Sequence, residues 1–212
     1  MKSSQFRSDP KLLRNNFPVT NNHQMPILKR IDLPYFDNYL SYRDTKSNDN
    51  RSRQSSILVH FFQDDYRFKS IYDYGTGEKA QNIVRKLAQY TAVCTPDYSL
   101  YPQMPLPVQQ KQIFKSRWCG AYWESTGLCV IPTVTWGNEN SFAFCFEGIP
   151  TDSVVAISTV GCEDYKCDFM RGYSEMLKLL EPRCILCYGT PFFEMEGNII
   201  CFPHESFYKE AI

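Results

Sequence analysis

Six short apolar runs, separated mostly by segments with helical periodicity, constrain the fold of this chain more than any other feature. The runs occupy residues 56–62, 91–101, 128–135, 153–161, 184–189 and 198–202. Amphipathic or short helices are predicted at residues 78–90, 107–125, 141–146 and 168–180. Strands that are apolar on both faces and alternate with helices are typical of a buried parallel sheet. The sequence therefore predicts an α/β fold, a mostly parallel sheet with flanking helices, either (β/α)-barrel-like or doubly wound.

The composition is that of a protein with one large core. The 212 residues are 43% hydrophobic and 15% aromatic, which is enough for a single compact domain. No window approaches the roughly 18 consecutive apolar residues of a membrane span, and residues 1–10 do not resemble a secretion signal. The nine cysteines are an odd number without such a signal, which favours reduced thiols. We therefore expect a cytoplasmic protein that has no membrane partner.

The amino-terminal quarter differs in charge and composition from the rest. Residues 1–56 hold ten Lys or Arg and five Asp, and they are rich in proline and asparagine. Residues 57–212 hold 13 Lys or Arg and 18 Asp or Glu. The basic segment either docks on its own domain or contacts nucleic acid. We predict an irregular basic arm over residues 1–56 and a single α/β domain over residues 57–212.

Polar and aromatic side chains gather where the predicted strands end. In parallel α/β proteins, ligands bind at the carboxyl ends of the strands. Asp97 lies in the second run, where its predicted strand ends, and Glu139 follows the third run, so these two carboxylates are the candidate catalytic residues. The alternative is that such residues only form turns and cap helices, where Asp, Asn, Ser and Thr are favoured. The candidate ligand-binding residues are Tyr98, Tyr101, Arg117, Thr133, Trp136, Asn138, Ser158 and Tyr188.

Each type of candidate side chain indicates a different kind of contact. Two neighbouring carboxylates can divide acid and base roles or bind a divalent cation, so a cation stays open although no cofactor is predicted. The aromatic candidates offer flat faces to a base, a sugar ring or a peptide side chain. Arg117 suits a phosphate or carboxylate, or else it pairs with Asp97 or Glu124 to hold its helix in place.

Several well-known motifs are missing from the sequence. There is no G-x-x-x-x-G-K-[ST], no G-x-G-x-x-G and no G-x-S-x-G, so a phosphate loop, a dinucleotide fingerprint and a hydrolase elbow are unsupported. Cys162, Cys167, Cys184 and Cys187 have a spacing that suggests zinc. However, Cys184 and Cys187 lie three apart on a predicted strand and so point to opposite faces. No zinc site is predicted.

Six segments of the chain, in order, resemble one family. They are "HFFQDDYRF", "TPDYSLYPQMPL", "SRWCGAYW", "VIPTVTW", "SFAFCFEGIP" and "VVAISTVGC". Together they are similar to domain of unknown function forty-four-seventeen, a family carried mainly by phages, plasmids and other mobile elements of bacteria. The resemblance covers roughly residues 57–189 and implies a mobile-element gene. It implies no reaction and therefore no catalytic role for any residue.

Two classes of function follow from the sequence. The first is a phage-type or mobile-element protein that binds a small polar, nucleotide-like or nucleic-acid ligand at the carboxyl ends of its strands, with catalysis left open. The second is a non-catalytic protein that engages a host or phage component. A final expectation concerns the geometry of the ligand site. Trp136, Glu139 and Asp97 are predicted to surround one concave site.

Overall fold

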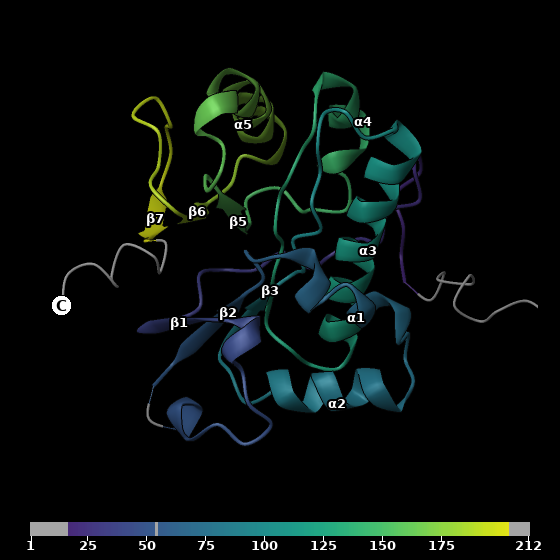
Figure 1. Cartoon of the computed structure of the whole chain (residues 1–212), viewed down its shortest axis with the longest axis vertical. Coiled ribbons are helices and arrows are strands. Elements are labelled where there is room, and N and C mark those ends of the chain that lie inside the picture. The colour runs from purple at the N-terminus through teal and green to yellow at the C-terminus, as the bar shows by residue number, and fades with distance from the viewer. Residues whose placement is uncertain (1–16, 54, 204–212) are drawn as a thin grey trace, which may run out of the picture.

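Two parallel sheets form the centre of the molecule (Figure 1). The structure, a computed structural model, describes residues 17–53 and 55–203. The first sheet has the order β1-β2-β3-β4 and the second has the order β5-β6-β7, with every pairing parallel. The strands are β1 Asn38–Ser41, β2 Ile57–His60, β3 Ala92–Cys94, β4 Val130–Ile131, β5 Val154–Ser158, β6 Cys184–Tyr188 and β7 Ile199–Phe202.

Backbone hydrogen bonds link the two sheets between β4 and β5. The Val134 N–H donates to Ala156 O (2.8 Å), and the Ala156 N–H donates to Pro132 O (2.9 Å). Thr133 and Ala156 form a parallel bridge, so the strands follow chain order from β1 to β7. A doubly wound sheet reverses its strand order at a switch point, and neither sheet does so. The predicted α/β class with parallel strands and flanking helices is confirmed.

One apolar cluster fills the space between the two sheets. It includes Leu58 of β2, Ala156 of β5 and Leu186 of β6, all of them buried. At the outer strands, the ring centroids of Tyr39 in β1 and Phe202 in β7 lie 5.0 Å apart. Within the described residues, β1 and β7 form no backbone pair. The barrel-like alternative therefore stays a prediction.

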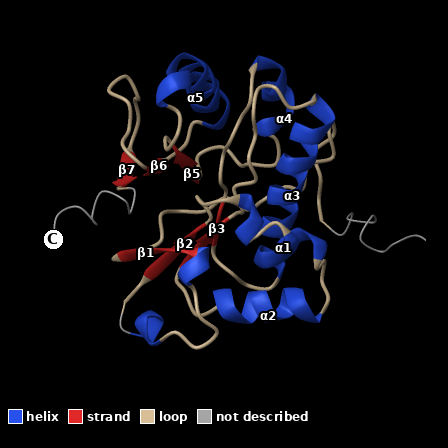
Figure 2. Ribbon diagram, in the orientation of Figure 1, coloured by secondary structure: helices blue, strands red, loops and turns tan. Residues whose placement is uncertain are grey.

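Helices cover the opposite face of each sheet, because alternate residues of a strand point to opposite sides. Val59 of β2 packs in one cluster with residues of α2 and α3, and Ile157 of β5 packs in another with residues of α5. Figure 2 shows α2 below, α3 to the right and α5 above the strands. Across the described ranges, no helix is long and apolar enough to cross a membrane. The helices are α1 Ser70–Asp73, α2 Glu78–Leu87, α3 Leu106–Ser125, α4 Phe142–Cys145 and α5 Lys166–Leu180, with short 3-10 helices at η2 Tyr42–Asp44, η3 Asn50–Arg53, η4 Asp65–Arg67, η5 Glu139–Ser141 and η6 Glu163–Tyr165.

The strand that leads to the candidate site is shorter than its sequence predicts. The apolar run 128–135 forms regular strand only at Val130–Ile131. Pro132 has no N–H to donate to a neighbouring strand, which interrupts the regular ladder. After the bridge at Thr133, the chain leaves the sheet and delivers Trp136 beyond the strand end.

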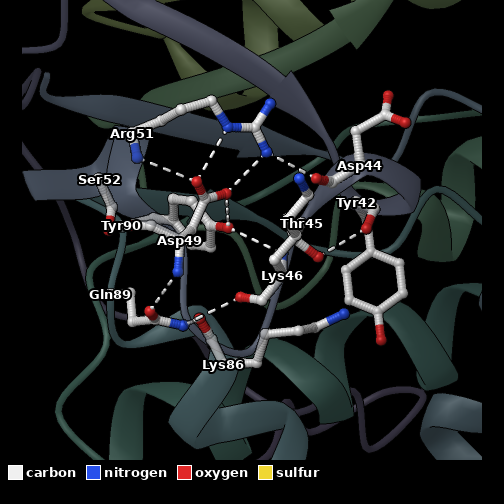
Figure 3. A network of polar contacts seen from close by, with 10 residues as sticks. All are labelled: Tyr42, Asp44, Thr45, Lys46, Asp49, Arg51, Ser52, Lys86, Gln89 and Tyr90. Atoms are coloured by element: carbon white, nitrogen blue, oxygen red, sulfur yellow. Dashed lines mark hydrogen bonds and ion pairs between the residues drawn. The ribbon is translucent and has the colours of Figure 1, made fainter.

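The segment before β2 is joined to the domain along much of its length. Residues 1–56 are predicted as an irregular arm, yet Asn38–Ser41 forms β1, which pairs with β2 along all four of its residues. Farther on, the buried Asp49 carboxylate binds the Arg51 Nη2 (2.7 Å) and the Tyr90 Oη (2.7 Å), as Figure 3 shows. The strand was not predicted from the sequence, whereas attachment of the segment to its own domain was one of the two expectations.

Basic residues of the same segment are engaged by acidic neighbours. Arg30 Nη2 lies 2.9 Å from Asp152 Oδ2, which supports docking of the segment on its own domain. Arg43 Nε lies 3.1 Å from Asp44 Oδ1, an ion pair within the segment itself. Four further basic residues lie outside the described residues, namely Lys2, Arg7, Lys11 and Arg14.

Candidate functional site

A pocket of about 380 Å³ lies at the carboxyl ends of β3, β4 and β5, and we call it the strand-end pocket. Its walls come from the chain after β3, after β4 and after β5, and from the amino-terminal part of α5. This placement agrees with the usual position of ligands in parallel α/β proteins. The lining residues are Asp97, Ser99, Leu100, Tyr101, Pro102, Gln103, Thr135, Trp136, Gly137, Ser158, Val160, Gly161, Cys162, Tyr165, Asp168 and Phe169.

Asp97 is the lining residue with the most unusual electrostatics. Burial, and to a smaller extent the nearby Asp65 carboxylate, raises the pKa of its carboxyl to about 7. Asp65 is itself satisfied, because it accepts hydrogen bonds from the Ser99 N–H (3.1 Å) and the Ser99 Oγ (2.8 Å). Within the described part of the chain, no side chain or backbone group makes a hydrogen bond or ion pair with the Asp97 carboxyl. The strand-end pocket is therefore faced by a carboxyl group that changes its charge near neutral pH.

Trp136 forms an aromatic wall of the strand-end pocket. Only 9% of its surface is exposed, and its ring centroid lies 5.0 Å from that of Phe169. Gly172 in α5 permits this position, because a Cβ there would overlap the indole of Trp136. The indole is thus held rigidly between α5 and the pocket.

Glu139 lies in a different pocket from Asp97. It lines a second pocket of about 270 Å³ together with Asn138 and Arg171. The Arg171 Nη1 lies 3.5 Å from Glu139 Oε1 and 3.4 Å from Asp168 Oδ1, and all three side chains are exposed. Gly137 and Asp168 line both pockets, so the two are neighbours. Of the three residues predicted around one site, Asp97 and Trp136 line the strand-end pocket and Glu139 lines the adjacent one.

Arg117 is fully buried and lies behind the site rather than in its lining. Its guanidinium donates to three backbone carbonyls, of Thr133 (2.9 Å), Cys145 (2.8 Å) and Glu147 (3.1 Å). Burial lowers the pKa of Arg117 to about 10. The predicted alternative of a bond to Asp97 or Glu124 is not what holds it, since its donors are taken by the chain around α4 and after β4.

Two further candidates have buried positions that support the framework. Thr133 Oγ1 donates to Thr95 O (2.7 Å), and Thr95 Oγ1 accepts from the Thr133 N–H (2.8 Å). The Tyr98 ring lies 5.3 Å from the Phe68 ring, with Lys115 Nζ 3.7 Å from its centroid.

The remaining candidates divide between the pocket and its surroundings. Tyr101 and Ser158 line the strand-end pocket. Asn138 Nδ2 donates to Pro102 O (3.1 Å), which ties the chain after β4 to the chain after β3. Tyr188 lies on the interior side of β6, where its ring centroid is 5.3 Å from that of Phe62.

Tyr165, Asp168 and Phe169 line the strand-end pocket but were not among the predicted site residues. They come from η6 and the first turn of α5, where charged and aromatic side chains on a predicted helix give no separate signal. The available hint is position alone, because a helix that follows a strand in a parallel α/β fold begins near the strand's carboxyl end.

The described residues do not contain a ready set of metal ligands. No group of three or more His, Cys, Asp or Glu residues in ranges 17–53 and 55–203 is arranged to hold an ion. The charged side chains that line the strand-end pocket are Asp97 and Asp168, both acidic. What the pocket offers is therefore carboxylate acceptors and aromatic faces.

Comparison with known proteins places the chain among phage proteins. It is 35% identical over 180 residues to the Gene 1 protein of Mycobacterium phage L5, covering 84% of this chain and 76% of the relative. It is 34% identical over 180 residues to the Gene 1 protein of Mycobacterium phage D29, covering 84% of this chain and 64% of the relative. No solved structure matches. Residues 17–204 match the model of one family, so the match begins forty residues before the segments that carry the resemblance in the sequence. The chain is a phage-type protein and belongs to the family described as Domain of unknown function (DUF4417).

Proposed function

We propose that the strand-end pocket binds a small polar ligand that contains a flat, nucleotide-like ring. The observation that carries the proposal is Asp97, a carboxyl group that faces the pocket and receives no hydrogen bond from the described residues. Asp97 is half-buried, and a carboxyl group that is partly withdrawn from water gains binding energy from a ligand that donates a hydrogen bond to it. The volume of about 380 Å³ lies within the range of small-molecule sites.

The aromatic residues of the pocket support a flat ligand. Trp136 presents an indole held in place by α5, whereas Tyr101 is 57% exposed at the mouth of the pocket. Stacking on such rings accepts any base or similar ring, because every base has a π face.

Acid–base chemistry at this pocket is the catalytic form of the proposal. A general acid or base works best when its pKa lies near the working pH, and burial holds the pKa of Asp97 at about 7. Glu139 lies in the neighbouring pocket with Arg171, so it acts on a ligand only if that ligand extends past Gly137 and Asp168. Asp97 is therefore the proposed acid–base residue.

The test is binding of nucleosides and nucleotides, measured by calorimetry, to the full chain and to two tyrosine variants. Tyr101→Ala removes an exposed ring from the pocket mouth, and we expect it to weaken binding by about 5- to 100-fold, as loss of one stacked base contact does. Tyr35→Ala is the matched control, because Tyr35 is 76% exposed and does not line the pocket. Equal effects of the two variants, or no binding by the unaltered chain, would exclude the pocket as the ligand site.

The second candidate function is engagement of a host or phage protein without catalysis. It is favoured by exposed apolar side chains near the same edge: Val160 and Tyr165 line the pocket, and Phe193 is 99% exposed next to Phe192, which contacts Phe169. Exposed aromatic residues are enriched where proteins bind one another. A Phe193→Ser variant that loses a phage function while nucleoside binding is unchanged would favour this candidate.

A further inference from the structure

We propose that the strand-end pocket selects a flat group with two adjacent N–H donors, such as a guanidinium or the amino–imino edge of guanine, and excludes phosphate from its interior. This inference rests on the proposed function, because it specifies the ligand chemistry of the same pocket. Two small-molecule sources share that chemistry, a guanine nucleoside and a free alkylguanidine.

The charge of the pocket argues against an anionic group inside it. Asp97 and Asp168 are the charged side chains of the described lining, and no Lys, Arg or His is among those sixteen residues. The carboxylate of Asp65 adds further negative potential at Asp97. A phosphate in this pocket would face like charges without a basic partner.

The nearest basic side chains are already engaged by acidic groups or an aromatic ring. Lys166 Nζ lies 2.7 Å from Glu194 Oε1, and the guanidinium of Arg171 is shared by Asp168 and Glu139. Lys115 Nζ lies over the Tyr98 ring, 3.7 Å from its centroid. These contacts direct the basic groups elsewhere, so the acidic character of the pocket is not neutralised by them.

The geometry of a carboxylate favours a ligand with two parallel N–H donors, a donor fork, over a ligand with a single donor. A carboxylate has two oxygens in one plane and accepts two parallel N–H bonds from a guanidinium or a similar edge. Among the described residues, none makes a hydrogen bond to the Asp97 carboxylate, which leaves its acceptors available to such a pair. The Trp136 indole and the exposed rings of Tyr101 and Tyr165 offer faces on which a planar guanidinium or base can stack.

The experiment compares matched ligands by calorimetry on the full chain at about pH 8, where the Asp97 carboxyl is ionised. Guanosine is set against inosine, which lacks the exocyclic amino group, and agmatine is set against putrescine, which replaces the guanidinium with an ammonium. We expect the ligand with the donor fork to bind at least about 10-fold tighter in at least one pair. The pair that shows the preference identifies the source of the fork. Inorganic phosphate should not compete.

The outcomes separate this inference from the function on which it rests. If inosine and putrescine bind as tightly as their partners, or if phosphate competes, the donor fork is wrong while ligand binding by the pocket stands. If none of these ligands and no nucleotide binds, both proposals fail.

Two aspartate variants locate the preference within the pocket. Asp97→Asn keeps the shape of the side chain but removes its charge and one acceptor, so it should weaken binding of the preferred ligand by about 10-fold or more. Asp168→Asn makes the same change on an exposed lining residue that is paired with Arg171, and it should weaken binding by no more than about 3-fold. Equal losses in the two variants would show that overall negative charge, and not a fork on Asp97, selects the ligand.

A pH titration of the unaltered chain tests the same point without a substitution. The titratable groups around Asp97 are Asp65, Cys94, Cys162 and Asp168, and burial raises the pKa of both thiols, which keeps them neutral. Lowering the pH from about 8 to about 6 protonates Asp97, while guanosine and agmatine keep their charge, so affinity should fall by about 10-fold. A constant affinity over this range would contradict the role of Asp97.

Discussion

Asp49 and Asp97 are two aspartates withdrawn from water whose carboxyl groups have opposite electrostatics. Asp49 accepts hydrogen bonds from Arg51 Nε (2.9 Å), Arg51 Nη2 (2.7 Å) and Tyr90 Oη (2.7 Å), as seen in Figure 3. These donors hold the pKa of Asp49 well below its usual range. Asp97 receives no such donor from the described residues, and burial raises its pKa to about 7. Burial therefore does not decide the charge of a carboxyl group by itself, because the supplied donors can reverse its effect.

The two environments suit two different roles. Asp49 connects the chain before β2 to Gln89 and Tyr90, which follow α2, since its N–H donates to Gln89 Oε1 (3.0 Å) and its carboxylate accepts from Tyr90 Oη. All of its bonding capacity is used inside the protein. Asp97 receives no hydrogen bond from the described residues, which costs stability when the carboxyl ionises.

The largest expected effect comes from removing the charge of Asp49. Asp49→Asn should lower the free energy of unfolding by about 2–3 kcal/mol at neutral pH, because it replaces charge-assisted hydrogen bonds with neutral ones and leaves Arg51 poorly paired. The pKa of Asp49 is lowered by folding, so its stabilisation is present above the unfolded pKa of about 4 and is lost as the pH falls below it. Urea unfolding at about pH 7 and about pH 3 should therefore show a smaller difference between the two proteins in acid.

A matched control for Asp49 is the neighbouring Asp44. It pairs with Arg43 at the surface, where its side chain is 38% exposed. Asp44→Asn should change stability by less than about 0.5 kcal/mol. Comparable losses of unfolding free energy in the two variants would show that the buried hydrogen bonds of Asp49 stabilise the fold no more than an exposed ion pair does.

Removing the charge of Asp97 should raise the free energy of unfolding, the opposite of the result expected for Asp49. The pKa of Asp97 is raised by folding, so its contribution to stability is fully present below the unfolded pKa of about 4 and is lost as the pH rises through about 7. Asp97→Asn removes this cost, and we expect the variant to be more stable by about 1–2 kcal/mol at about pH 8 and equal at about pH 4. Urea unfolding at both values is the measurement. A loss of stability at about pH 8 would mean that ionised Asp97 has a structural partner. The contrast drawn between Asp49 and Asp97 would then be wrong.

The sequence predicted the parts of the fold that depend on burial of whole segments. Apolar runs that alternate with amphipathic helices have few ways to bury both faces, and the observed parallel strands with α2, α3 and α5 follow from that pattern. β1 was missed because only one of its four residues is buried, so Asn38–Ser41 lacks an apolar run. It forms because β2 offers an open edge to it.

The candidate site was predictable to the extent that it depends on strand ends. Asp97 and Trp136 line one pocket because each lies shortly after the carboxyl end of a strand of the same sheet, β3 or β4. Arg117 was placed among the ligand-binding candidates because a sequence cannot distinguish a guanidinium that binds a ligand from one that binds three backbone carbonyls. Asp168 entered the pocket through the packing of α5, which no local pattern encodes.

The smallest expected effect comes from removing one hydrogen-bond donor of Asp49, the Tyr90 hydroxyl. Tyr90 Oη donates to Asp49 Oδ2 (2.7 Å) and also accepts from the Lys46 N–H (3.2 Å), so Tyr90→Phe removes both bonds and leaves the ring in place. We expect a loss of about 1 kcal/mol in the free energy of unfolding, because Arg51 continues to bind the carboxylate. Combining Tyr90→Phe with Asp49→Asn should cost less than the sum of the two single losses, since one substitution removes and the other weakens the same hydrogen bond. Strict additivity in urea unfolding would show that Tyr90 and Asp49 act independently, and Asp49 would then be held by Arg51 alone.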